Sequence, residues 1–143
     1  EAVEIALCCG WIDGQKKKLD DDYSLQRFTP RRPRSMWSKL NVDRVAALTK
    51  AGRMQPSGQA QVDKAKADGR WDRAYDPQST MEIPPDLAAV FKKNKVAATN
   101  FEALNRSNKF AILFRINDAK KPETRVARIE KYVAMLERGE RLY

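Results

Sequence analysis

The stretch between residues 76 and 85 sets the first limit on how this chain can fold. It contains three prolines and no hydrophobic periodicity. Proline lacks a backbone N–H and disrupts the interior of helices and central strands, so neither element can run through this stretch. We therefore predict a linker at residues 76–85. It would join an N-terminal region, residues 1–75, to a C-terminal region, residues 86–143.

The C-terminal region is predicted to be helical throughout. Helices are expected at residues 87–93, 96–104 and 108–119, and the last is apolar on most sides, which is typical of a central, buried helix. Pro122 is expected to open the final helix, because proline fits the first helical turn. Apolar residues then recur at helical spacing, at Val126, Ile129, Val133 and Leu136. This pattern predicts a helical bundle.

The N-terminal region begins with a helix and a β-hairpin. Residues 1–9 have the pattern of a helix that ends at Gly10. Residues 15–19 and 23–29 predict an antiparallel hairpin, and an isolated hairpin needs further strands or a helix to be stable. The chain also starts at Glu1 rather than at methionine. We therefore expect that an N-terminal part, which supplies such strands, is missing from this sequence.

Further helices are expected before the linker. Ser35 is a good N-cap for a short helix to residue 40, and Asn41 for a helix over residues 42–51. Ser57 is expected to start another helix, which ends near residue 69. The predicted fold class is α+β: a small antiparallel hairpin-based sheet packed with helices, followed by a C-terminal helical bundle.

Composition narrows the classes of function. The 143 residues include 28 Lys and Arg, 19 Asp and Glu and no histidine, which gives a formal net charge of +9. Excess positive charge favours anionic partners such as nucleic acid, phosphorylated ligands or acidic surfaces. The commonest general base and metal ligand is absent, so no metal, cofactor or catalytic residue is predicted. The longest apolar run has five residues, too few to span a membrane.

The two cysteines bear on the compartment. Cys8 and Cys9 are adjacent in sequence and have no distant partner. A disulfide between neighbours is strained, so we expect two reduced thiols in a reducing compartment. This predicts a cytoplasmic protein, unless a targeting signal has been lost ahead of residue 1.

Residues 27–39 are the main candidate site. This stretch is rich in arginine, has no acid and is stiffened by two prolines. Arginine forks bind phosphate and carboxylate groups in a bidentate manner, and a helix N-terminus at the end of the stretch would favour the same negative charge. The predicted anion-binding residues are Arg27, Arg31, Arg32, Arg34, Ser35, Trp37 and Ser38. The alternative is a solvated basic loop whose Trp37 belongs to the core.

Two shorter motifs are candidates for supporting roles. Residues 10–14 carry Trp11 and Asp13, and Asp13 could anchor a nearby arginine. Residues 119–125 carry a second set, composed of Lys120, Glu123 and Arg125. The simpler interpretation of each motif is structural: a helix-to-strand corner for the first, and a helix corner with a solvated face for the second.

Three motifs carry a resemblance to a known family. They are Ala-Leu-Cys-Cys-Gly-Trp-Ile-Asp-Gly at residues 6–14, Arg-Phe-Thr-Pro-Arg-Arg-Pro at 27–33 and Ala-Lys-Lys-Pro-Glu-Thr-Arg at 119–125. In order and spacing they resemble the YdeI/OmpD-associated, or bacteriocin-protection, family over nearly the whole chain. The resemblance implies a role in stress or antimicrobial-peptide resistance, and a strand-bearing segment ahead of the first helix. A chain of charge +9 would, however, repel cationic peptides.

Three functions stay open from the sequence. The first is a non-enzymatic binding protein that holds an anionic ligand or an acidic surface at residues 27–39. The second is a nucleic-acid-binding protein that adds Lys120, Lys121, Arg125 and Arg128 to that loop. The third is an enzyme acting on a phosphorylated or carboxylate substrate, with Asp13 or Glu123 as its acid or base.

Overall fold

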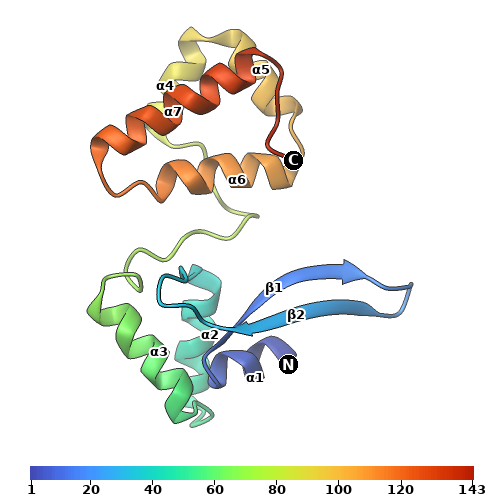
Figure 1. Cartoon of the computed structure of the whole chain (residues 1–143), viewed down its shortest axis with the longest axis vertical. Helices are drawn as coiled ribbons and strands as arrows, with labels where there is room; N and C mark the ends of the chain where they lie inside the picture. The colour runs from blue at the N-terminus through green and yellow to red at the C-terminus, as the bar shows by residue number, and fades with distance from the viewer. The chain divides into compact units, whose positions relative to one another are not determined.

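The computed structural model describes all 143 residues, Glu1–Tyr143, as seven helices and one two-stranded sheet (Figure 1). This confirms the α+β class. The chain divides into two compact units, Glu1–Asp76 and Pro77–Tyr143. None of the helices is both long and apolar enough to cross a lipid bilayer.

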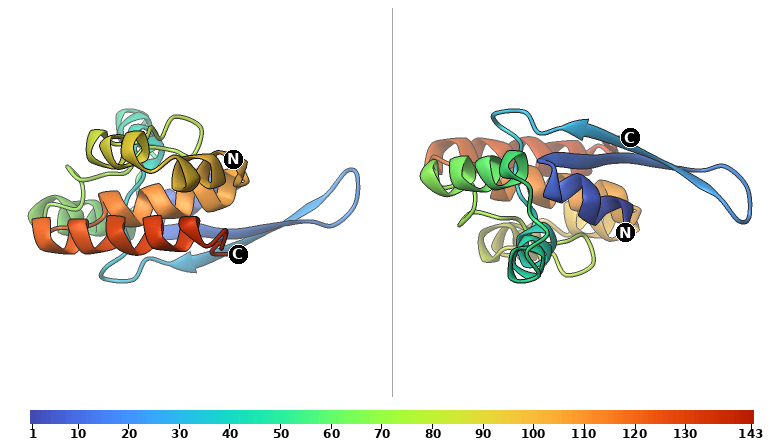
Figure 2. Two further views of the ribbon diagram at one scale, coloured as in Figure 1. Left: turned by 90° about the horizontal axis from the view of Figure 1, so that it is seen from above. Right: turned by 90° about the horizontal axis from the view of Figure 1, so that it is seen from below.

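The N-terminal unit joins a β-ribbon to three helices. Its elements are α1 (Ala2–Cys8), β1 (Trp11–Lys18), β2 (Ser24–Pro30), α2 (Lys39–Lys50) and α3 (Pro56–Ala67). The strands pair antiparallel from Trp11 opposite Pro30 to Lys18 opposite Ser24, with an irregularity between Asp13 and Lys16. The predicted hairpin is confirmed, although β1 starts four residues earlier than expected. Figure 2 shows the ribbon projecting beyond the helices of its own unit.

The core of the N-terminal unit forms where α1 meets the other elements. Helix α1 contacts β1, α2 and α3. Gly58 of α3 lies so close to α1 that a Cβ at this position would be 2.1 Å from the Cys8 carbonyl oxygen. The buried side chains are Leu7, Cys8, Trp37, Val45, Leu48, Val62 and Ala65. The glycine therefore sets the close approach of α1 and α3 on which this core depends.

Helix α2 starts differently from the sequence-based prediction. One helix replaces the two expected segments, and Ser38, not Ser35, is its N-cap. The Ser38 hydroxyl accepts a hydrogen bond from the Asn41 amide, and Asn41 is buried inside the helix. The Ser35 hydroxyl instead accepts from the Arg32 amide and closes a turn. The prediction of Ser35 and Asn41 as caps was therefore wrong, because both serines fit the N-cap pattern and only the local turn separates them.

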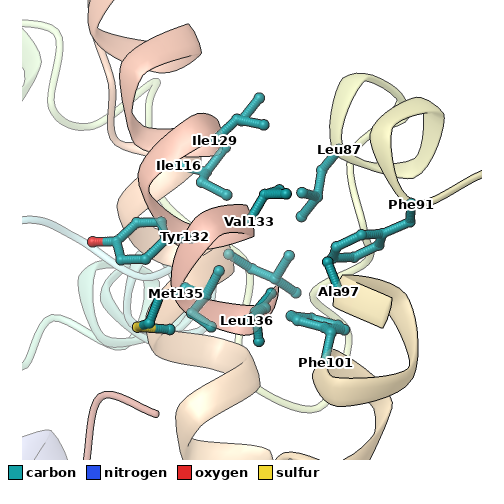
Figure 3. Packing of buried hydrophobic residues seen from close by; sticks show 12 residues of the cluster. Leu87, Phe91, Ala97, Phe101, Ile116, Ile129, Tyr132, Val133, Met135 and Leu136 are labelled. Carbon is teal, nitrogen blue, oxygen red and sulfur yellow. The ribbon is translucent and has the colours of Figure 1, made fainter. Parts of the chain in front are cut away.

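The C-terminal unit is a four-helix assembly of α4 (Pro85–Lys93), α5 (Lys95–Ala103), α6 (Arg106–Asn117) and α7 (Pro122–Glu137). Figure 3 shows side chains from these helices meeting in one cluster around Val133 and Leu136 of α7. Ile112 and Ile116 of α6 are fully buried, and Phe110 of the same helix is half-buried. The opening of the last helix at Pro122 is confirmed. Helix α6 was expected to be the central one, but α7 is the helix that contacts both α5 and α6, and Phe114 of α6 is only half-buried.

One buried polar side chain attaches the C-terminal tail to this cluster. The Oδ1 atom of Asn108 accepts hydrogen bonds from the backbone amides of Leu142 and Tyr143, at 2.9 and 3.1 Å. Its Nδ2 group donates to Asn105 Oδ1 at 3.0 Å. Asn108 is 1% exposed, so these bonds supply the partners that a buried amide requires.

Candidate functional site: the basic loop

Arg31 is the buried centre of the basic loop, residues 27–39. Its backbone amide donates to the Gly10 carbonyl at 3.1 Å, which fixes the chain as it leaves β2. Its guanidinium carbon lies 3.5 Å from the centroid of the Trp37 ring, and its Nη1 group donates to the Met36 carbonyl at 3.2 Å. Arg31 is 7% exposed and Trp37 is 1% exposed. A cation is thus stacked on an aromatic face inside the protein.

Part of this guanidinium has no hydrogen-bond acceptor. The Nε and Nη2 atoms of Arg31 are buried and have no partner. Burial lowers the pKa of Arg31 to about 10, against the opposing influence of Tyr75 and Asp13, so the side chain remains charged at neutral pH. A buried charge with unused donors is unfavourable unless another group meets it.

Tyr75 and Asp13 complete the electrostatic surroundings of Arg31. The Tyr75 amide donates to the Trp37 carbonyl at 3.0 Å, and the Lys39 amide donates to the Tyr75 carbonyl at 2.9 Å, which forms a parallel bridge. Burial, and then the Asp13 carboxylate, raise the pKa of Tyr75, whose side chain is hydrogen-bonded to Ser38. A carboxylate, a guanidinium and a phenol therefore share one environment.

A second buried arginine, Arg70, is hydrogen-bonded to the backbone of the basic loop. Arg70 donates through Nη1 to the Ser35 carbonyl at 2.8 Å, and its Nη2 atom lies 2.8 Å from an Asp68 carboxylate oxygen. It is 8% exposed. Arg31 and Arg70 thus donate hydrogen bonds to the carbonyls of two neighbouring residues, Met36 and Ser35 respectively. Neither Arg70 nor Tyr75 was a predicted site residue, because both lie far along the chain from the loop.

The remaining loop residues lie outside this buried centre. Arg27, Arg32 and Arg34 are exposed and form no ion pair. Two amides at the start of α2 are already paired, because Tyr75 and Ser38 accept hydrogen bonds from the Lys39 and Asn41 amides. These two amides are therefore not free to bind an anion.

The three tryptophans of the N-terminal unit differ in their surroundings. Trp37 packs edge-on against Trp71 at a centroid distance of 5.0 Å, within the core, as the alternative interpretation of the loop expected. Trp11 is 41% exposed on β1. The structure thus brings Asp13, Arg31, Trp37, Ser35 and Ser38 together around the loop, and leaves Trp11 outside.

The supporting residues of motif 119–125 lie in the C-terminal unit, where Arg125 has a structural role. Its Nε and Nη2 groups donate to the two carboxylate oxygens of Asp86, at 2.5 and 3.0 Å. Its Nη1 group donates to the Ile116 carbonyl at 3.1 Å. Arg125 therefore connects the start of α4 to the end of α6, where the negative end of the helix dipole favours a cation. Lys120 and Glu123 are exposed and form no ion pair.

Two family models divide the chain between them. Residues 80–139 match the family described as "Bacteriocin-protection, YdeI or OmpD-Associated". The C-terminal unit is a YdeI/OmpD-associated domain. Residues 1–61 match a different model, described as a domain of unknown function, DUF8412. No curated protein and no solved structure matches the chain.

The family recognised from the sequence is thus confirmed, and the match places it in the C-terminal unit. Of the three motifs that carried the resemblance, residues 119–125 lie in the YdeI/OmpD-associated domain. Residues 6–14 and 27–33 lie in the stretch matched by the other model. The basic loop and the named domain therefore belong to different units of the chain.

The Asp86–Arg125 pair predicts an acid-sensitive contribution to the stability of the YdeI/OmpD-associated domain. The hydrogen bonds from Arg125 hold the pKa of Asp86 below its ordinary value. A carboxyl with a depressed folded-state pKa stabilises the fold above its unfolded pKa of about 3.9, and this contribution is lost as the pH falls through the folded value. The pair is partly exposed, so we expect less than about 1 kcal/mol at pH 6.

Urea unfolding of Arg125→Gln, followed by far-UV circular dichroism, measures this contribution. The variant should be less stable than the wild type at pH 6, and the difference should shrink between pH 4 and pH 2, a range that follows from the carboxyl titration. Arg141→Gln is the matched control, because Arg141 is exposed and has no ion pair. A difference that stays constant down to pH 2 would show that Asp86 is not the partner that matters.

Proposed function

We propose that the protein is a non-enzymatic binding protein whose N-terminal unit holds an anionic ligand at the basic loop. The observation that supports this is Arg31, a nine-tenths buried guanidinium with two donor atoms that no acceptor meets. Carboxylate and phosphate groups are the natural acceptors for such a fork, because each offers two oxygens at matching spacing. The ligand supplies the hydrogen bonds that the protein itself leaves unmade.

The surroundings of Arg31 favour a small anion over a large one. Its unused donors are buried, so a ligand reaches them only when the groups that cover them move aside. Arg32 and Arg34 are exposed, unpaired cations on this same segment, and they would raise the local concentration of anions. The Asp13 carboxylate acts on Arg31 and repels an anion bound there, so binding is expected to be weak.

The test follows the Arg31 Nε–H signal by ¹H–¹⁵N NMR while sodium phosphate or sodium acetate is added. A saturable shift of this signal is expected with at least one of the two, together with smaller shifts of residues 32–36. Arg31→Gln lacks the reporter signal, so in this variant the shifts of residues 32–36 should disappear. Arg34→Ala should weaken binding by about two- to five-fold, the range of an exposed charge pair. Arg53→Ala is the matched control, because Arg53 pairs with Glu4 away from the loop. A silent Arg31 signal with both anions would refute the proposal.

Nucleic-acid binding is the second candidate, supported by Arg27, Arg32 and Arg34, which are exposed and unpaired. Of the four C-terminal residues in this hypothesis, Lys120 and Lys121 are exposed. Arg125 and Arg128 are engaged by Asp86 and by the Arg115 carbonyl, which weakens the candidate. Phosphate contacts release counterions, so each loop arginine that binds DNA contributes about 0.9 to the slope of log affinity against log salt. A triple alanine variant that leaves this slope unchanged would eliminate the candidate.

The family description supports a protective role against bacteriocins, and we propose that any such role works through an anionic partner. A protein of charge +9 repels cationic peptides rather than capturing them. Tight, salt-sensitive binding of a cationic peptide would overturn this. The free thiols of Cys8 and Cys9 support a reducing compartment, the cytoplasm, as the place of action. Periplasmic fractionation of the native protein would contradict that location.

A further inference from the structure

The YdeI/OmpD-associated domain contains a cavity with no role in the function proposed above. Its volume is about 310 Å³, at the lower end of the range for small-molecule sites. It lies among the end of α5, the start of α6 and the segment that precedes α4. Its apolar lining consists of Met81, Ile83, Phe101, Leu104, Phe110 and Leu113. A site of this size and lining suits a short hydrocarbon chain.

The rim of the cavity carries an unbalanced positive charge. Lys109 is neutralised by Glu102, at 2.9 Å. Arg106 also lines the cavity, is exposed and forms neither an ion pair nor a side-chain hydrogen bond. Among the charged residues that line the cavity, Arg106 is therefore the one without an ion-pair partner.

The position of Arg106 in its helix strengthens this point. It is the first residue of α6, and the first turn of α6 contains no acidic residue. The positive end of the helix dipole favours an acid at this position and disfavours a cation. Asn105 caps the helix through the Asn108 amide, so the cap does not offset the charge of Arg106. An anion at the mouth of the cavity would interact favourably with both the guanidinium and the helix end.

A neighbouring hollow shows the contrast. It has a volume of about 340 Å³, and Gln78 and Phe110 line both spaces. Its cation is Arg115, which donates to the Tyr143 hydroxyl at 3.0 Å. That guanidinium already has a partner, whereas Arg106 has none. The cavity at Arg106 is therefore the better place for a charged ligand.

We propose that this cavity binds a small amphiphile that has one apolar chain and an anionic head group. The chain would lie among Met81, Leu104 and Leu113, where burial of apolar surface provides the driving force. The head group would remain at the rim beside Arg106. The unpaired guanidinium of Arg106 at the rim disfavours a cationic head group. This proposal concerns the C-terminal unit and does not depend on the anion site at Arg31.

The test uses the full chain with ¹³C-labelled methyl groups and sodium octanoate as the probe. Saturable shifts are expected at the Met81, Leu104 and Leu113 methyls, with a Kd on the order of 1 mM for so small a ligand. Acetate has the head without the chain and should leave these methyls unmoved. Octylammonium has the chain with the opposite charge and should bind more weakly than octanoate.

Arg106→Gln separates the head-group contact from the cavity itself. It should weaken the binding of octanoate about three-fold, because an exposed charge pair at the rim contributes little more than that to affinity. The binding of the neutral probe octanol should not change. Arg141→Gln removes an exposed, unpaired arginine outside the cavity and is expected to change neither. The proposal fails if octanoate shifts do not saturate, if they map elsewhere, or if Arg106→Gln weakens octanoate and octanol equally.

Discussion

Gly58→Ala is expected to destabilise the N-terminal unit by about 3 kcal/mol, since it overpacks a contact that has no room to relax. The added Cβ would lie 2.1 Å from the Cys8 carbonyl oxygen and 2.9 Å from that of Leu7. Both atoms belong to the backbone of α1, so no side-chain rotation can relieve the overlap. Helix α1 would have to move away from α3, and that movement would expose the core around Leu7 and Cys8.

The sign of this change makes the test decisive. In an unobstructed helix, replacing glycine by alanine stabilises by about 1 kcal/mol, because alanine loses less backbone entropy on folding. A stabilised or unchanged variant would therefore show that α1 and α3 do not approach as described. All three tryptophans lie in the N-terminal unit, so urea unfolding followed by tryptophan fluorescence reports on it.

Gly14→Ala is the matched control for this substitution. Its Cβ would lie 3.6 Å from the Arg27 carbonyl oxygen, which is an ordinary contact, and Gly14 has no positive φ. We expect a change within about 0.5 kcal/mol, the usual range for a surface substitution. A large loss at Gly14 would mean that the ribbon tolerates no added side chain, and the comparison would then say nothing specific about α1 and α3.

Local sequence patterns were sufficient to predict most elements of the fold, for identifiable reasons. The hairpin follows from an acidic turn and from alternation in residues 23–29, and α7 follows from a first-turn proline and apolar residues at helical spacing. Cap positions were less predictable, because Ser35 and Ser38 offer the same hydroxyl at neighbouring positions. The choice between them depends on a turn that Ser35 closes with Arg32, which no periodicity reveals.

The arrangement of the candidate site could be predicted only in part. The basic loop is visible in the sequence, and so is a set of arginines without acids. The sequence does not distinguish Arg31, which is buried on Trp37, from Arg32, which is exposed beside it. That distinction arises from contacts with Tyr75 and Arg70, which are distant along the chain. In the sequence, Arg125 was equally a candidate for contacting a ligand. In the structure its guanidinium is bound to Asp86, which is also distant along the chain.

Trp37→Ala is the second substitution for which a large effect is expected. It should lower the free energy of unfolding of the N-terminal unit by about 4 kcal/mol. Removing a fully buried tryptophan leaves a large cavity, and losses of about 3–5 kcal/mol are usual for this change. Here the loss includes the edge-on contact with Trp71 and the ring on which Arg31 stacks. Unfolding should be followed by far-UV circular dichroism, because the substitution removes one of the fluorophores.

Trp37→Phe separates the ring from its polar group. The Trp37 Nε1–H is buried and has no hydrogen-bond partner, so replacing it with a hydrocarbon ring relieves an unfavourable burial. Trp37→Phe should therefore lower the free energy of unfolding by less than half as much as Trp37→Ala does. Equal losses would contradict the interpretation that the aromatic ring, and not the indole nitrogen, stabilises this part of the core.

A double-mutant cycle with Arg31→Met then measures the coupling free energy between the Arg31 guanidinium and the Trp37 ring. In the wild-type background, Trp37→Ala leaves a buried guanidinium without its aromatic face, whereas in the Arg31→Met background no charge is left behind. Trp37→Ala should thus be less destabilising in the second background, by about 1 kcal/mol, the size of a partly desolvated cation–π contact. Additive losses would mean that Trp37 only fills space. Coupling would mean that the core holds Arg31 in place with two donors unused, which is the arrangement an anion site requires.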